Sequence, residues 1–154
     1  MMKIQVGQKA PDFTLADNQG GQVKLSDMKG KKVLLSWHPL AWTSVCTDQM
    51  RALETHKKDF DQLNTVAFGL SVDAAPSKDV WAKVLSIRDT KLLSDFYPHG
   101  KVAQDYGIFL EELGASGRAN FLVDEEGVVR WLKIYDVPQL PDIDEVIKAI
   151  KDLS

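Results

Sequence analysis

The side chain with the most distinctive chemistry in this sequence is Cys46, the only cysteine among 154 residues. A cysteine reacts as its thiolate, which is favoured in the first turn of a helix, where backbone N–H groups are unpaired and the helix dipole is positive. Cys46 follows an apolar run at residues 33–37 and the loop residue Pro39, and a helical pattern begins near Ser44. The sequence therefore places a candidate nucleophile where a strand passes through a loop into a helix.

Several neighbours of Cys46 have types that would serve such a nucleophile. Thr43, three residues earlier, can either cap the helix or hydrogen-bond the sulfur. Trp37 and Trp42 stand on either side of the loop, and we expect them to exclude water and form an apolar pocket. An alternative fits the same pattern, because Cys46 shares an apolar helical stripe with Met50 and can be an inert core residue. Position by itself leaves both interpretations open.

The loop and the start of the helix carry a family motif. The string Pro39-x-x-x-Thr43-x-x-Cys46 is similar to the PxxxTxxC active-site motif of the peroxiredoxins, the AhpC/TSA family. Residues 117–124, GRANFLVD, resemble the strand that carries the active-site arginine of that family. Further collinear similarities are the opening VGQKAPDFTL, the segment SVD with a tryptophan after it, and SDFYPHG followed by YG, which together cover residues 6–135. The sequence most resembles the one-cysteine, AhpE-like branch.

The resemblance implies a role for each matched residue. Cys46 would attack the terminal oxygen of a peroxide and become a sulfenic acid. Thr43 would hydrogen-bond the thiolate or the peroxide oxygen. Arg118 would hold the thiolate and stabilise the charge that moves onto the leaving oxygen, while Pro39 would shield the sulfur from water.

Three positions depart from the family pattern. Gln49 follows Cys46 by three residues, where the family usually has Glu, so we expect a polar contact at the helix surface and assign it no catalytic role. His38 precedes the motif's proline; a hydrogen-bonded structural histidine is favoured over an electrostatic influence on Cys46. Trp42 replaces the common Phe, and with Val45 it is expected to form a larger apolar wall of the substrate pocket.

The resemblance implies a thiol-dependent peroxidase that acts on hydrogen peroxide and organic hydroperoxides. Because Cys46 is the only cysteine, no resolving cysteine exists, and an external thiol must reduce the sulfenic acid. That donor would be a low-molecular-weight thiol, a glutaredoxin-like protein or thioredoxin. The family also leads us to expect a homodimer.

Two other functions compete with this one. A thioredoxin-type disulfide oxidoreductase needs a C-x-x-C pair, which this chain lacks. A non-catalytic module that relays peroxide signals or acts as a holdase would not need Thr43, Cys46 and Arg118 together. Turnover separates these functions, because a peroxidase consumes many equivalents of hydroperoxide and a relay consumes few or none.

Composition excludes several classes of partner. A net charge of −3 and a pI near 5.6 predict no binding to nucleic acid or to an anionic membrane. No apolar run approaches the roughly 20 residues of a membrane helix, and residues 1–11 lack the apolar core of a signal peptide, so we expect a cytoplasmic protein. The three histidines show no metal-ligand spacing, and residues 114–117 are predicted to be a turn rather than a phosphate loop. We therefore expect neither a metal nor a cofactor.

Hydrophobic periodicity predicts one domain over residues 1–154, without repeats or linkers. Alternating or apolar runs bounded by turn residues predict strands, and apolar residues three and four apart predict helices. The expected strands are residues 12–16, 22–25, 33–37, 65–72, 91–94, 120–123 and 128–133. The expected helices are residues 44–63, 77–87, 101–106 and 143–153.

Two of these helices carry more detailed expectations. In the helix over residues 77–87, the side chains expected to face the core are Val80, Trp81, Val84 and Leu85. Before the last helix, Asp142 with Glu145 matches a capping box. The order of elements predicts an α/β fold with a mixed sheet and helices on both faces. The family resemblance makes this a thioredoxin-like fold with an N-terminal β-hairpin.

Overall fold

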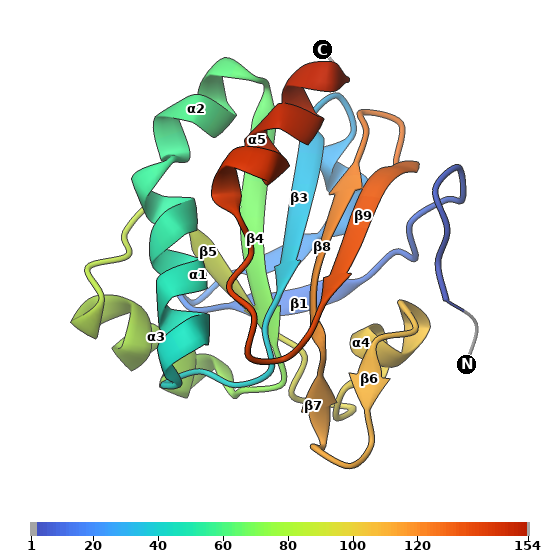
Figure 1. Ribbon diagram of the computed structural model, residues 1–154. Coiled ribbons are helices and arrows are strands. Elements are labelled where there is room, and N and C mark those ends of the chain that lie inside the picture. Colours follow the sequence, from blue (N-terminus) through green and yellow to red (C-terminus); the bar gives the residue numbers. More distant parts are fainter. Residues whose placement is uncertain (1–2, 154) are drawn as a thin grey trace.

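A mixed β-sheet forms the centre of the protein, seen in a computed structural model that describes residues 3–153 (Figure 1). Its strands are β1 Thr14–Asp17, β2 Gln22–Lys24, β3 Lys32–Trp37, β4 Thr65–Ser71, β5 Lys91–Ser94, β8 Arg118–Val123 and β9 Val129–Tyr135. They lie in the order β2-β1-β5-β4-β3-β8-β9. The central strands β3, β4 and β5 are parallel, whereas β1 and β8 pair antiparallel with β5 and β3.

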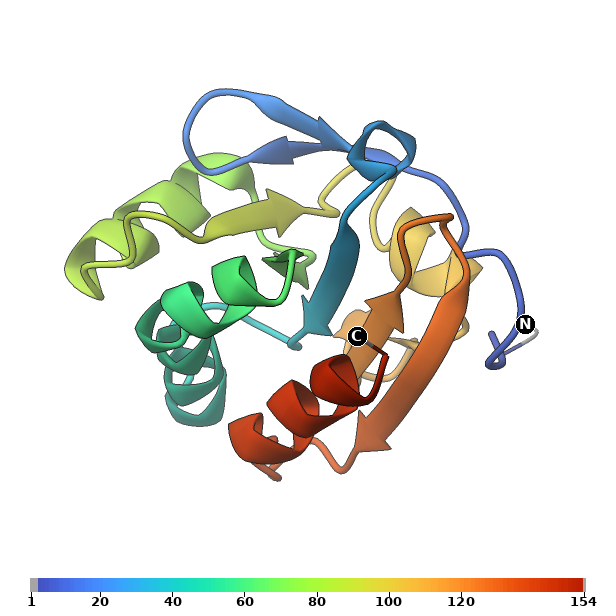
Figure 2. The same ribbon diagram turned by 90° about the horizontal axis from the view of Figure 1, so that it is seen from above.

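Helices cover both faces of this sheet. One face carries α1 Ser44–Thr55, α2 Lys57–Gln62, α3 Ala75–Val84 and α5 Ile143–Asp152, whose buried side chains share one hydrophobic core. The other face carries α4 Lys101–Asp105 and the short 3-10 helix η1 Leu25–Met28, which contribute to a second core. Figure 2 shows α1 and α5 on the side of the sheet away from α4. Within residues 3–153 no helix combines the length and the apolar character needed to cross a membrane.

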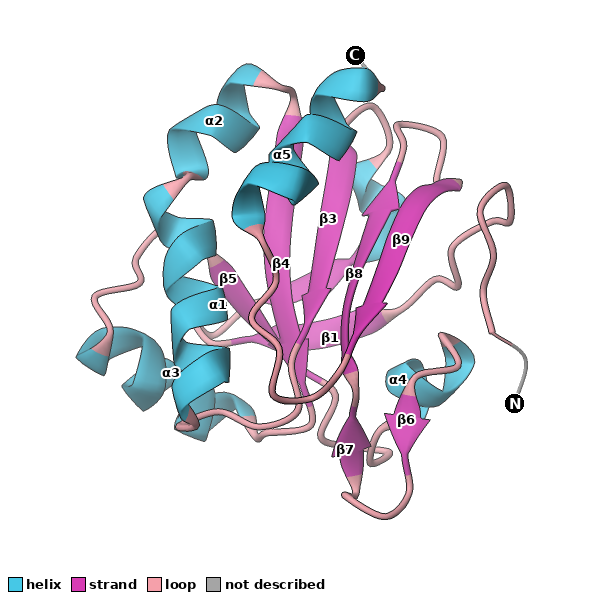
Figure 3. Cartoon of the chain, viewed as in Figure 1, coloured by secondary structure: helices cyan, strands magenta, loops and turns pink. Residues whose placement is uncertain are grey.

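Strand β3 lies inside the sheet, between β4 and β8 (Figure 3), and its side chains contribute to both cores. Val33, Leu35 and Trp37 belong to the core on the α4 side, and Leu34 belongs to the core on the α1 side. Because successive side chains of a strand point to opposite faces, Ser36 follows Leu34 onto the α1 side. The apolar run thus forms a strand that is buried on both faces.

Helix α1 approaches the sheet closely where β4 carries Gly69. A Cβ atom at Gly69 would clash with the sulfur of Met50. Met50 lies one turn after Cys46 on the same face of α1. The absence of a side chain at Gly69 therefore lets the first turns of α1 rest directly on the sheet.

The predicted helix over residues 44–63 is two helices in the structure. The chain leaves the helical region at His56, with φ −97° and ψ 16°, and α2 begins at the next residue. Phe60 in α2 is buried in the same core as α1, so the predicted apolar stripe continues across the break. The prediction of a single helix was wrong because periodicity does not register one residue with non-helical dihedrals.

The next predicted helix was shifted along the chain. It runs over Ala75–Val84 rather than residues 77–87, and Pro76 stands in its first turn, where a missing N–H costs nothing. Trp81 is buried as predicted, but Val80 and Val84 are exposed. The inward face of α3 is therefore turned away from the predicted one, a difference that matters for the site.

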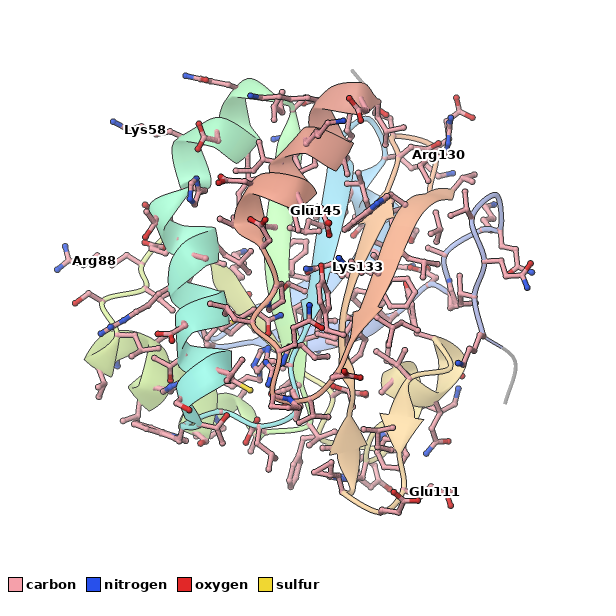
Figure 4. All side chains as sticks on the ribbon, in the orientation of Figure 1. Lys58, Arg88, Glu111, Arg130, Lys133 and Glu145 are labelled. Atoms are coloured by element: carbon pink, nitrogen blue, oxygen red, sulfur yellow. The ribbon has the colours of Figure 1, made fainter. Side chains whose placement is uncertain are left out.

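Smaller differences concern the second half of the chain. Residues Phe109–Leu110 and Ala115–Ser116 form a separate two-stranded sheet, β6 and β7, where only a turn was predicted. The predicted capping box is also incomplete, because Asp142 accepts a hydrogen bond from the N–H of Asp144. Glu145 instead binds Lys133 of β9, with Nζ and Oε1 2.7 Å apart, and the two lie side by side in Figure 4.

Candidate active site

Cys46 lies in the first turn of α1, immediately after the loop that follows β3. The first intrahelical hydrogen bond runs from the N–H of Thr47 to the carbonyl of Thr43. The N–H groups before Thr47, including that of Cys46, therefore have no acceptor within the helix. Cys46 is 1% exposed, so its sulfur lies at the positive end of the helix dipole in a site that is shielded from water.

Thr43 occupies the N-cap position of α1, but its side chain makes neither of the two bonds that the sequence predicts. The backbone is extended there, and no cap hydrogen bond to the helix is formed. The hydroxyl donates its one proton to the carbonyl of Leu40, with oxygens 2.9 Å apart. In this arrangement the hydroxyl cannot donate to the Cys46 sulfur, and only its lone pairs remain free for a ligand.

Arg118 is brought to Cys46 by strand register. In the antiparallel pair of β3 and β8, Ala119 lies opposite Trp37, so Arg118 stands beside the residue at which β3 gives way to the active-site loop. Ala119 and Trp37 face the α4 side of the sheet. Because side chains alternate, Arg118 faces the α1 side, where Cys46 lies.

The Arg118 guanidinium is buried and held from two directions. Its Nη1 lies 3.4 Å from the Cys46 sulfur and 2.7 Å from Gln49 Oε1. Its Nε and Nη2 donate to the carbonyl of Val137 over 2.9 and 2.6 Å. These fixed acceptors keep a permanent positive charge against the sulfur, as the predicted role of Arg118 requires.

Gln49 is a site residue that the sequence interpretation missed. The prediction of a helix-surface contact was wrong, because Gln49 is buried. Its Nε2 donates to Ser36 Oγ over 2.8 Å and to the Trp37 carbonyl over 3.1 Å, while its Oε1 accepts from Arg118. Spacing could have revealed this, since residues three apart share a helix face and Gln49 lies three after Cys46. Gln49 ties the guanidinium to β3.

The aromatic residues around the loop divide between the two faces of the sheet. Trp37 was wrongly predicted to wall the pocket, because it packs on the α4 side, with its ring 6.0 Å from that of Tyr106. Trp42 does border the loop: it is 52% exposed, and its indole N–H donates to Ser77 Oγ of α3 over 3.1 Å. Val45 next to Cys46 is half-buried. The two expected pocket residues thus lie at the surface end of the site.

The loop itself is fixed by Asp73, two residues after β4. Asp73 Oδ2 accepts from the N–H of Ala41 over 2.8 Å and from Ser71 Oγ over 2.6 Å. Pro39 is buried within this loop. Trp42 adopts a φ of 73°, a region that bulky residues seldom occupy, so the surrounding contacts determine the backbone there. These contacts hold the backbone of the loop in which Pro39 is buried.

His38 and Lys78 form a second buried polar group at this end of the sheet. Both side chains are 0% exposed, and Lys78 Nζ lies 3.5 Å from His38 Nε2. Burial lowers the pKa of Lys78 to about 7. Burial and then the charges of Lys78 and Arg118 hold the pKa of His38 well below its usual value. The predicted hydrogen-bonded histidine is therefore bonded on one side only, since Nδ1 has no partner in the described part of the chain.

The family of this chain follows from its sequence similarity to known proteins. Residues 6–132 match the model of the AhpC/TSA family. This chain belongs to that family. The alkyl hydroperoxide reductase E of Mycobacterium tuberculosis is 37% identical over 140 residues, which cover 90% of this chain and 91% of the relative. Peroxiredoxin 2 of Thermoplasma acidophilum is 37% identical over 159 residues, 97% of this chain and 76% of the relative.

Solved structures of the AhpC/TSA family share the fold. The reduced 2-Cys peroxiredoxin of Plasmodium vivax has a TM-score of 0.88 and 29% sequence identity to this chain, over 96% of this chain and 81% of that one. The predicted thioredoxin-like fold, a central mixed sheet flanked by helices, is thereby confirmed. Family membership with a single cysteine makes the chain a thiol-dependent peroxidase of the one-cysteine type.

The described residues offer no obvious metal centre. Between residues 3 and 153, no three His, Cys, Asp or Glu side chains gather closely enough to hold a metal ion.

Proposed function

We propose that Cys46 reduces hydrogen peroxide and small organic hydroperoxides and becomes a sulfenic acid, which an external thiol then reduces. The observation that carries this proposal is the 3.4 Å contact between Arg118 Nη1 and the Cys46 sulfur in a buried site. A guanidinium held there stabilises the thiolate and also the negative charge that passes to the leaving oxygen.

Oriented donors are needed because thiolate formation alone achieves little. Lowering a thiol pKa from about 8.5 to about 6 raises the thiolate fraction at pH 7 roughly 30-fold. With a Brønsted slope of about 0.45, the same change costs roughly ten-fold in nucleophilicity. The remaining acceleration must come from groups that act on the transition state, which here are Arg118 and the free N–H of Cys46.

The loop residues would position the substrate. The Thr43 hydroxyl, whose proton is engaged with Leu40, accepts the O–H of the incoming hydroperoxide. Buried Pro39 keeps water from the sulfur, and Trp42 with Val45 forms the apolar border against which an organic hydroperoxide rests. Each of these contacts orients the peroxide bond toward Cys46.

The second half of the cycle requires a partner. With no second cysteine, the sulfenic acid is reduced by a low-molecular-weight thiol, a glutaredoxin-like protein or thioredoxin. Such donors are kept reduced in the cytoplasm, which we propose as the compartment in which the protein works.

We also propose a homodimer. Large apolar side chains are exposed on loops at the active-site end, with Tyr97 86%, Phe96 53% and Leu113 47% exposed. Monomeric proteins seldom leave such side chains uncovered in a group. Analytical ultracentrifugation of the reduced protein tests this, and a monomer at micromolar concentration contradicts it.

The peroxidase proposal is tested by adding one equivalent of hydrogen peroxide to the reduced protein. We expect a rapid change in tryptophan fluorescence, a sulfenic acid on Cys46 by mass spectrometry, and repeated turnover when a thiol donor is present. Cys46→Ser should lose all three responses. A sulfenic acid without turnover, for every donor of a panel, would instead favour a signalling relay or a holdase.

A further inference from the structure

The peroxidase reaction leaves one buried charged group without a role. Lys78 projects from α3 into the core, and its ammonium has one neighbour at the limit of hydrogen bonding, His38 Nε2 at 3.5 Å, among the residues described. Lys32 is also buried, but its Nζ donates to the Leu63 carbonyl over 3.0 Å and lies 3.6 Å from Glu125. Burying an ammonium without strong partners is costly, so Lys78 requires a separate explanation.

Ionisable groups from several elements face Lys78. After burial, which lowers its pKa, the charges that act on it are those of Asp73 after β4, Cys46 in α1 and Asp95 after β5, and each of them raises its pKa. His38, at the end of β3, is the direct contact. Lys78 is thus a cation whose protonation depends on the charge of the nucleophile.

This dependence links the protonation of Lys78 to the oxidation state of Cys46. Oxidation to a sulfenic acid removes the negative charge from the sulfur. The pKa of Lys78 then falls further below about 7, while Asp73 and Asp95 stay as they were.

We propose that Lys78 is a redox-linked proton reservoir: its protonated fraction is higher while Cys46 is a thiolate and falls when the sulfur becomes a neutral sulfenic acid. The proposal rests on the peroxidase function and deepens it. Lys78 is a positioning residue in this scheme, because it acts through the charge on Cys46 and through its contact with His38.

The proton balance of the cycle fits this role. As the sulfur forms its bond to the terminal peroxide oxygen, the O–O bond breaks, the sulfur is oxidised by two electrons, and the leaving oxygen needs one proton to become an alcohol or water. Averaged over many molecules, Lys78 provides a fraction of these protons, so fewer are taken from solvent. When two external thiols reduce the sulfenic acid to thiolate, a disulfide, water and one proton are formed, and Lys78 is charged again.

Proton uptake measured in weakly buffered indicator solution tests the proposal. One equivalent of hydrogen peroxide is added between pH 5.5 and 9.5, sulfenic acid is counted by mass spectrometry, and the thiolate fraction is measured by absorbance at 240 nm. We expect the uptake per sulfenic acid to fall below the thiolate fraction by a few tenths of a proton near pH 7, with no shortfall above about pH 9. Uptake equal to the thiolate fraction at every pH overturns the proposal.

Two variants of the same helix separate Lys78 from its surroundings. Lys78→Met should remove the shortfall, so that uptake follows the thiolate fraction. Lys83→Met changes an exposed lysine paired with Asp79 and should keep the wild-type shortfall. A shortfall that persists in folded Lys78→Met, verified by circular dichroism, assigns the proton to another group and rejects the proposal.

Alkylation gives a measurement that does not depend on peroxide. Iodoacetamide also converts the thiolate to a neutral sulfur, and this reaction itself consumes no proton. Wild-type protein should therefore release more protons near pH 7 than its un-ionised thiol fraction accounts for, and Lys78→Met should release only that fraction. If the peroxidase function fails, no sulfenic acid forms but the excess release remains; if the reservoir is wrong, the excess is missing.

Discussion

Two buried basic side chains lie at the active-site end of the sheet, and the structure holds them in different ways. Arg118, on a strand, is fixed by the Val137 carbonyl and by Gln49 Oε1 at distances of 2.6 to 2.9 Å. Lys78, on a helix, makes one hydrogen-bond contact among residues 3–153, between its Nζ and His38 Nε2 at 3.5 Å. An arginine cannot lose its proton in a protein, whereas a buried lysine readily does. Arg118 therefore supplies a constant charge, and Lys78 supplies one that changes with pH and oxidation state.

The largest expected effect comes from removing the fixed geometry while keeping the charge. Arg118→Lys loses the fork that contacts the sulfur, Gln49 and Val137 together. We expect the rate of reaction with hydrogen peroxide to fall by roughly 100-fold or more, as for loss of one oxyanion-hole donor. Stopped-flow tryptophan fluorescence measures this rate.

An exposed arginine provides the matched control. Arg130→Lys changes a side chain that is paired with Asp124 at the surface, and it should react at the wild-type rate. If Arg118→Lys reacted within a few-fold of wild type, the fixed cation would contribute charge only, and the contrast with Lys78 would largely disappear.

A smaller loss is expected when the support of the fixed cation is removed. Gln49→Leu deletes two donated hydrogen bonds to β3 and the acceptor for Arg118 Nη1. We expect a roughly ten-fold slower peroxide reaction. We also expect the free energy of unfolding to fall by about 2–4 kcal/mol, because buried groups lose their hydrogen-bond partners. Urea denaturation measures the second effect.

The control for Gln49 is Gln104→Leu, at an exposed position of α4, which should change neither quantity. Loss of stability with an unchanged peroxide rate would show that Gln49 supports the fold but does not orient Arg118.

The sequence predicted the fixed cation far better than the variable one. Cys46 was singled out by its place between a buried strand and a helix, and Arg118 was assigned through the family resemblance of residues 117–124. The predicted strand began only at residue 120, whereas β8 begins at Arg118. Lys78 was missed because periodicity was judged from apolar residues, which favoured Val80 and Val84 as inward positions. The stripe in the structure is spaced by three and four from residue 78, with Trp81 and Ala82 buried, and a charged residue at its first position concealed it.

Hydrophobic periodicity could not predict other features of the fold, for similar reasons. The break at His56 changes backbone dihedrals but not the apolar stripe. Thr43 has the right type for an N-cap, yet its hydroxyl binds the Leu40 carbonyl, a choice that depends on how the loop folds back. Tertiary contacts of single polar atoms decided these cases.

The protonation of Lys78 should affect the free energy of unfolding as well as proton uptake. The pKa of Lys78 is about 7 in the folded protein, against 10.5 for an ordinary lysine. Between these values the unfolded chain binds one more proton, so the free energy of unfolding should rise with pH, by at most about 1.4 kcal/mol per unit. Lys78→Met lacks this dependence and should be the more stable protein at pH 7, by roughly 2–5 kcal/mol.

Urea denaturation at several pH values measures this difference, which should shrink as pH approaches 10. Lys32→Met provides the contrast, because that lysine has close partners and its loss should destabilise the protein. A wild-type stability curve parallel to that of Lys78→Met would mean that Lys78 stays charged throughout.

The smallest expected effect comes from a substitution that changes the pKa of Lys78 and leaves the lysine in place. Asp73→Asn keeps an oxygen that can accept from Ala41 and Ser71, so the active-site loop should hold its shape. The carboxylate charge is lost, and because that charge raises the pKa of Lys78, the pKa should fall. We expect the maximum of the proton shortfall to move to lower pH by less than about one unit, with the peroxide rate within a few-fold of wild type. Asp79→Asn, on the outer side of α3, should leave the maximum in place. A rate loss as large as that of Arg118→Lys would show that Asp73 acts through the loop and through Arg118. The effects of Arg118 and of Lys78 would then be coupled rather than separate.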